Sequence, residues 1–151
     1  MTKGEPQPAS REIMAGCLAG RIRLLNRSVT GLYDHALRGV GVTAGQLTTL
    51  SFIHELGPLA PGELAPRLMM DKSTLSRNLS RMERNGWITI EPGEAGRTQA
   101  LRITRKGRSV VARALPRWRE AQAEARELLG EGGAEAVVGA FEAVRAGGGM
   151  A

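Results

Sequence analysis

Hydroxyl and guanidinium side chains recur between positions 72 and 84 at the spacing of one helical face. At about 100° per residue, Leu75, Leu79 and Met82 share one face of such a helix. The opposite face, the first turn and the flank carry Lys72, Ser73, Thr74, Ser76, Arg77, Ser80, Arg81 and Arg84. Arginine binds guanine O6 and N7 with two hydrogen bonds, and small hydroxyl groups reach bases or phosphates without holding the helix away from the groove. The pattern predicts a DNA-contacting helix. The alternative is an ordinary solvated face, which would more often carry Glu, Lys and Gln.

Positive charge is concentrated in the same part of the chain. The net charge is +6, and residues 61–110 carry ten basic and five acidic side chains. Residues 1–60 carry six basic and four acidic side chains, and residues 111–151 carry five and six. A basic excess confined to one central stretch favours a polyanion such as double-stranded DNA as partner. Charge alone is equally compatible with a solvated basic face.

The hydrophobic period changes after the Ser/Arg helix. Residues 87–90 form a short β-rich run, and residues 101–103 alternate in polarity. Between them, residues 91–99 are rich in turn formers and include Arg97 and Thr98. We expect a β-hairpin with a long tip, and we count Arg97 and Thr98 among the candidate DNA contacts.

The elements that must position this surface are predicted by periodicity and capping residues. Helices are expected from Arg11 to before Gly39, from a Thr43–Gln46 capping box to Gly57, over 61–68, over 72–85 behind an Asp71 cap, from a Thr104 cap to Leu129, and over 134–145. The first has one apolar stripe, made of Ile13, Cys17, Leu18, Ile22, Leu25, Val29, Leu32 and Ala36. Pro66 should shorten or distort the third helix, and Pro116 should bend the fifth. The chain is therefore mainly α with a small β-hairpin.

Composition excludes several classes of protein. The chain has 151 residues, the usual length of one domain, with 42% apolar and only 3% aromatic residues, which argues against a β-sandwich. It has no apolar run long enough for a membrane span and no secretory signal, so we expect a cytoplasmic protein. The single cysteine, Cys17, excludes an internal disulfide. His35 and His54, with Asp34 and Glu55, lack the spacing of a helical zinc motif. We therefore predict no metal, no cofactor and no enzymatic activity.

The stretch LTTLSFIHELGPLAPGELAPRLMMDKSTLSRNLSRMERNGWITIEPGEAGRTQALRITRKGR resembles the winged-helix core of the MarR family of bacterial transcriptional regulators. The resemblance extends upstream and covers about residues 12–130. Its most telling pieces are DKSTLSRNLSRMERNGWI, the wing arginine Arg97 and LRITRKG. It implies a winged helix-turn-helix with long dimerisation helices. The implied units are a flexible arm (1–10), a dimerisation helix (11–42), the DNA-binding lobe (43–110), C-terminal dimerisation helices (111–146) and a flexible tail (147–151).

The resemblance also implies roles for individual residues. The helix over 72–85 would enter the major groove with Arg77 as main base reader, and Ser73, Thr74, Ser76 and Arg81 would support it. Arg97 would contact the minor groove or a phosphate. The family often has Asp two residues before the wing arginine, where this chain has Ala95. The implied function is a homodimeric repressor that a small phenolic or amphipathic ligand releases from a pseudo-palindromic operator.

A ligand site between the lobe and the dimerisation helices would draw on a set of apolar and polar side chains. The candidates are Leu25, Val29, Tyr33, Leu50, His54, Met69 and Met70. Ordinary core packing is the favoured role for any one of them, because Met fills core gaps well. Cys17 offers thiol-based redox sensing as an alternative function, although we expect a small buried residue there. Two further alternatives are a protein-interaction module that does not read DNA and a sequence-independent chromosome-binding protein.

Overall fold

The computed structural model describes residues 8–93, 96 and 98–147. In chain order the elements are α1 (Pro8–Gly16), α2 (Leu18–Leu37), the short 3-10 helix η1 (Arg38–Val40), α3 (Ala44–Leu56), α4 (Pro61–Leu68), α5 (Lys72–Arg84), β1 (Ile88–Pro92), β2 (Gln99–Ile103), α6 (Arg105–Leu129) and α7 (Gly133–Ala146). The prediction of a mainly helical chain with one β-hairpin is confirmed. No helix in the described ranges is long and apolar enough to cross a membrane.

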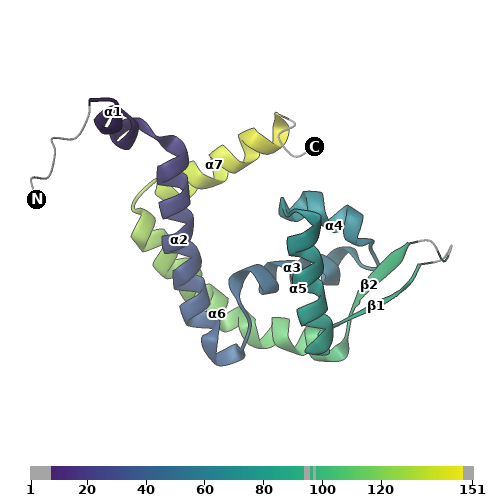
Figure 1. Cartoon of the computed structure of the whole chain (residues 1–151). Coiled ribbons are helices and arrows are strands. Elements are labelled where there is room, and N and C mark those ends of the chain that lie inside the picture. The colour runs from purple at the N-terminus through teal and green to yellow at the C-terminus, as the bar shows by residue number, and fades with distance from the viewer. Residues whose placement is uncertain (1–7, 94–95, 97, 148–151) are drawn as a thin grey trace, which may run out of the picture.

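Two groups of elements make up the fold (Figure 1). α3, α4, α5 and the hairpin form a lobe, while α2 packs along α6 and α7 packs on α6. α6 passes below the lobe in this view and then turns along α2, and Pro116 lies inside this helix as predicted. One long helix therefore belongs to both groups and connects them mechanically.

The core lies inside the lobe. Its fully buried side chains include Leu50 of α3, Leu64 of α4, Met82 of α5 and Leu101 of β2. β1 and β2 pair antiparallel, with Ile88 opposite Ile103 at one end and Pro92 opposite Gln99 at the other. Leu59 adds a single bridge to the free edge of β2, through two backbone bonds with Leu101 of 3.4 and 2.8 Å.

The junction between hairpin and α6 is held tightly. Thr104 caps α6 by accepting a bond from Gly107 N (3.0 Å), and its hydroxyl lies 2.7 Å from the carbonyl oxygen of Gly86. A Cβ atom at position 107 would collide with the Trp87 carbonyl group, so only glycine allows this approach of α6 to the hairpin. The hairpin is thereby fixed to α6.

The N-terminal region differs from the single helix that the apolar stripe predicts. Helix α1 begins at Pro8, inside the segment expected to be a loose arm, and the chain breaks at Cys17, which has an extended backbone. The Cys17 sulfur accepts a hydrogen bond from Gly20 N at 3.3 Å and caps α2. Glycines at 16 and 20 weaken the continuous helix because glycine loses more entropy on ordering. The prediction of one helix through this region is wrong.

The expectation that Cys17 is a small buried residue is also wrong. Cys17 is exposed, not buried, and so is most of the stripe around it: Ile13 is 65% and Leu18 is 70% exposed. The spacing does identify one apolar face, but within this chain that face has little to pack against. A periodic stripe predicts burial only if a partner surface exists.

Elsewhere most local predictions agree with the structure, but the expectation that Pro66 shortens α4 is wrong. Thr43 and Gln46 form the capping box, with bonds of 3.2 and 3.0 Å. α4 spans the predicted residues despite Pro66, which lies exposed near the end of this short helix. α5 ends at Arg84, and Gly86 follows it with a φ of 70°. These features depend on neighbours three or four residues apart, which is why spacing alone locates them.

Candidate nucleic-acid interface and ligand cavity

The start of α5 is set by Asp71. Its carboxylate accepts bonds from Thr74 N (2.8 Å), the Thr74 hydroxyl (2.6 Å) and the Ser73 hydroxyl (2.7 Å). The bonds from Thr74 and then Ser73 hold the pKa of Asp71 well below its usual range. The carboxylate therefore stays ionised near neutral pH. It orients the two hydroxyl groups in the first turn.

The two faces of α5 divide as the spacing predicts. Leu75, Leu79 and Met82 are buried against the lobe. The exposed residues are Lys72, Ser73, Ser76, Arg77, Ser80, Arg81 and Arg84, while Thr74 is half-buried. We call this set, with Thr74, the α5 outer face. The Arg77 guanidinium lies 3.5 Å from the Thr74 hydroxyl oxygen, so the first turn and the central arginine touch.

Among the residues that the structure describes, the cations of the α5 outer face have no acidic partner. Within residues 8–93, 96 and 98–147, no ion pair involves Lys72, Arg77, Arg81 or Arg84. In the hairpin, by contrast, Arg102 lies 3.5 Å from Glu91. Cations without a protein partner can exchange their counterions for phosphate groups, which is the main sequence-independent source of DNA affinity.

Of the two wing contacts predicted from the sequence, the structure describes only Thr98. Thr98 is exposed, and its carbonyl oxygen accepts a bond from Gly93 N at 2.6 Å, which closes the base of the tip. Arg97, like Ala95, lies outside the described residues. The wing contact assigned to Arg97 therefore stays a prediction.

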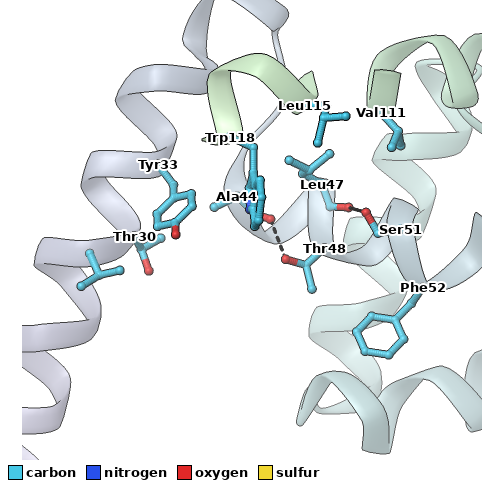
Figure 2. Close-up of a pocket in the computed structure, with 11 residues that line it drawn as sticks. Thr30, Tyr33, Ala44, Leu47, Thr48, Ser51, Phe52, Val111, Leu115 and Trp118 are labelled. Atoms are coloured by element: carbon cyan, nitrogen blue, oxygen red, sulfur yellow. Dashed lines mark hydrogen bonds between the residues drawn. The ribbon is translucent and has the colours of Figure 1, made fainter. Parts of the chain in front are cut away.

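A second feature is a cavity of about 520 Å³ between α2, α3 and α6 (Figure 2). Its lining consists of Val29, Thr30, Tyr33, Ala44, Leu47, Thr48, Ser51, Phe52, Val111, Leu115 and Trp118. Thr30 and Tyr33 lie on one side, and Thr48, Ser51 and Phe52 lie across from them on α3. The volume suits a small organic molecule, for which sites typically span roughly 300–1,000 Å³.

Two of the seven candidate ligand residues, Val29 and Tyr33, line this cavity. The other five lie outside its lining. Leu50 is fully buried in the core and Met70 is half-buried against it, whereas Leu25, His54 and Met69 are exposed. Met69 sits at the end of α4 with a φ of 50°.

Sequence reasoning missed nine residues of the lining. A usable signal existed for three of them, because Val111, Leu115 and Trp118 follow one side of the predicted fifth helix. No local pattern identifies Thr30 or Thr48 as cavity residues. Their role depends on how α3 docks between α2 and α6.

Tyr33 also joins two helices. Its hydroxyl group donates a hydrogen bond to the Gln122 side-chain oxygen of α6. Partial burial raises the pKa of Tyr33, against a smaller opposing effect of the Arg126 charge. The phenol therefore remains neutral at physiological pH.

No cluster of three or more possible metal ligands occurs in the described part of the chain. Asp34, one of the side chains considered for metal binding, instead accepts a bond of 2.7 Å from Ala44 N. It thereby ties the end of α2 to the start of α3. The Nδ1 atom of His54 lies 3.8 Å from the Oε1 atom of the neighbouring Glu55, and both side chains are exposed.

Comparison with known proteins gives a consistent result. A family model described as "MarR family" matches residues 40–97. An uncharacterized HTH-type transcriptional regulator of Bacillus cereus is 30% identical over 95 residues, which are 63% of this chain and 63% of that protein. The chain thus aligns with less than two thirds of the length of this curated relative.

Two solved structures extend the comparison to nearly whole chains. The M. tuberculosis transcriptional regulator MosR, solved in complex with DNA, is 32% identical, with a TM-score of 0.74. The alignment covers 87% of this chain and 98% of MosR. A mutant MarR from E. coli complexed with operator DNA has the same fold at 21% identity, with a TM-score of 0.78 and coverage of 88% and 96%.

Proposed function

The chain belongs to the MarR family of transcriptional regulators, and we propose that it is a homodimeric repressor that binds a specific operator. The observation that carries the proposal is the α5 outer face. It combines hydroxyl groups with four cations that have no acidic partner among the described residues. A helix with this surface and a buried opposite side suits the major groove.

Each part of this surface has a proposed task. Arg77 reads guanine, and Ser73, Thr74, Ser76 and Arg81 support it with contacts to bases or phosphates. Lys72, Ser80 and Arg84 add phosphate contacts on either side. Thr98, with Arg97 beyond the described residues, lets the hairpin reach the neighbouring minor groove.

Dimerisation is proposed from apolar surface that the single chain leaves exposed. Ile13 and Ile22 on the N-terminal helices are 65% and 62% exposed, and Val138 and Phe141 on α7 are 57% and 50% exposed. Faces this apolar are usually covered by a partner. A second copy would cover them within segments 11–42 and 111–146, and would leave lobe 43–110 free for DNA.

The cavity supports release by a small ligand. It is lined by α2 and α6, which belong to the proposed dimer, and by α3, which belongs to the lobe. A ligand that binds one relative position of these helices better than another shifts the population toward it. Such a shift changes the distance between the two recognition helices of a dimer, which must match half-sites about one helical turn apart.

The deciding experiment is selection of bound fragments from the source genome, followed by footprinting of the shared site. We expect a pseudo-palindrome and an affinity that falls steeply with salt. A ratio of specific to non-specific binding near one would indicate a chromosome-binding protein instead. Failure to retard any promoter fragment, together with a salt-independent protein partner, would indicate an interaction module.

A second candidate function, thiol-based redox regulation, is supported by the exposure of Cys17. An exposed thiol is accessible to oxidants, and a disulfide would require the other subunit or a small thiol because the chain has one cysteine. Titration of DNA binding with an organic peroxide separates the two candidates. An equal response of the wild type and Cys17→Ser would eliminate the redox function.

A further inference from the structure

The polar side chains that line the cavity are all uncharged. Four hydroxyl groups line it, from Thr30, Tyr33, Thr48 and Ser51, and none of the described lining residues carries a charge at neutral pH. Arg126, the cation whose charge acts on Tyr33, lies outside the lining and is ion-paired with Glu135 at 2.8 Å. A bound anion would therefore find no cation in the lining.

Each of the four hydroxyl groups has already donated its hydrogen. Thr48 donates to the Ala44 carbonyl oxygen at 3.0 Å and Ser51 to the Leu47 carbonyl oxygen at 2.9 Å (Figure 2). These two directions follow from chemistry, because a carbonyl oxygen can only accept.

The two hydroxyl groups on α2 are committed in the same way. Thr30 donates to the Asn26 side-chain oxygen at 3.3 Å, and Tyr33 donates to the Gln122 side-chain oxygen. What remains available at all four oxygens is lone pairs. The lining is thus a set of hydrogen-bond acceptors on an otherwise apolar wall.

We infer that the cavity selects uncharged aromatic ligands whose polar group donates a hydrogen bond, and that it rejects carboxylates. A carboxylate only accepts hydrogen bonds, so it would face four acceptors and could replace its lost hydration with a single donor at most. The indole N–H of Trp118 is the one lining side-chain donor without an acceptor among the described residues. A phenolic or amide group can donate to a hydroxyl oxygen and accept from that indole.

The inference rests on the proposed role of this cavity as the effector site, and its test is direct binding to the full-length protein. The probes are 2-naphthol, 2-methoxynaphthalene and 2-naphthoate, which share one aromatic body. At pH 7, 2-naphthol presents a neutral hydrogen-bond donor, 2-methoxynaphthalene a neutral acceptor and 2-naphthoate an anion. By calorimetry we expect 2-naphthol to bind roughly fivefold to tenfold more tightly than 2-methoxynaphthalene, the usual effect of one net hydrogen bond. We expect 2-naphthoate to bind most weakly.

A matched pair of variants assigns the preference to the cavity. Ser51→Ala removes one lining acceptor and should lower the ratio of the 2-naphthol affinity to the 2-methoxynaphthalene affinity about threefold. Ser28→Ala is the control, because Ser28 makes the same type of bond, to the Leu24 carbonyl oxygen at 3.1 Å, on an exposed part of α2 outside the lining. The control should keep the wild-type ratio.

Three results would overturn the inference: equal binding of 2-naphthol and 2-methoxynaphthalene, binding of 2-naphthoate as tight as that of 2-naphthol, or no binding of any probe. Failure of the proposed ligand release looks different. In that case 2-naphthol binds with the expected preference, but operator affinity does not change in its presence. The two measurements therefore separate ligand chemistry from regulation.

Discussion

The hydroxyl group of Tyr33 on α2 donates a hydrogen bond to the side-chain oxygen of Gln122 on α6. The two residues lie 89 positions apart in the chain. Tyr33 also lines the cavity, so the bond that ties these helices together lies at a wall that a ligand would touch. Cavity occupancy and the packing of α2 on α6 are therefore physically linked.

Removing this bond should weaken the helix pair. Tyr33→Phe leaves the half-buried Gln122 oxygen without its donor, and we expect a loss of about 1 kcal/mol in the free energy of unfolding. Urea denaturation of Tyr33→Phe, Gln122→Leu and the double variant measures the coupling between the two side chains. Strict additivity of the two single effects would show that the bond contributes nothing to stability.

Arg77 should control sequence selectivity. Arg77→Ala removes a side chain that can form two bonds to guanine, and we expect a loss of about 1–3 kcal/mol in preference for operator over random DNA. Competition binding at fixed salt measures this ratio. Arg119→Ala is a suitable control because Arg119 is an exposed arginine of α6 outside the DNA-binding lobe. An unchanged ratio in Arg77→Ala would reject the assignment of Arg77 as base reader.

Asp71 should make stability depend on pH in the acid range. Its pKa in the folded protein is lowered, chiefly by the Thr74 hydroxyl bond, so the contribution to stability is complete above the unfolded pKa of about 3.9. As pH falls from that value toward the lowered pKa of the folded protein, the unfolded chain takes up the proton first, and the contribution is progressively lost. Urea midpoints of the wild type and Asp71→Asn should therefore differ most at pH 7, and the difference should be smaller at about pH 3. A constant difference across this range would contradict the explanation.

Charge placed on α7 should prevent assembly. Phe141 is 50% exposed in the single chain, and Phe141→Glu would bring a carboxylate into the proposed subunit interface. We expect sedimentation to show a shift from dimer to monomer, with weaker operator binding. Leu56→Glu makes a similar change on α3 of the lobe, where Leu56 is 44% exposed, and should leave the dimer intact. A dimer that survives the Phe141 substitution would place the interface elsewhere.

Local features of this protein could be predicted from the sequence because they involve residues close together along the chain. The Thr43–Gln46 box, the caps at Asp71 and Thr104 and the buried face of α5 all depend on separations of three, four or seven residues. Such contacts form inside one helix whatever surrounds it. The candidate DNA surface was predicted for the same reason, since it lies on a single helix.

Only the tertiary structure decided which side chains meet across helices. Leu47 and Leu50 are both buried apolar residues of α3, yet Leu47 lines the cavity and Leu50 does not. The choice depends on the angle at which α3 docks between α2 and α6, and periodicity carries no information about that angle. The same limit applies to the stripe around Cys17. The sequence by itself determined that those residues share a helical face, but whether that face is buried depends on a surface that the single chain does not supply.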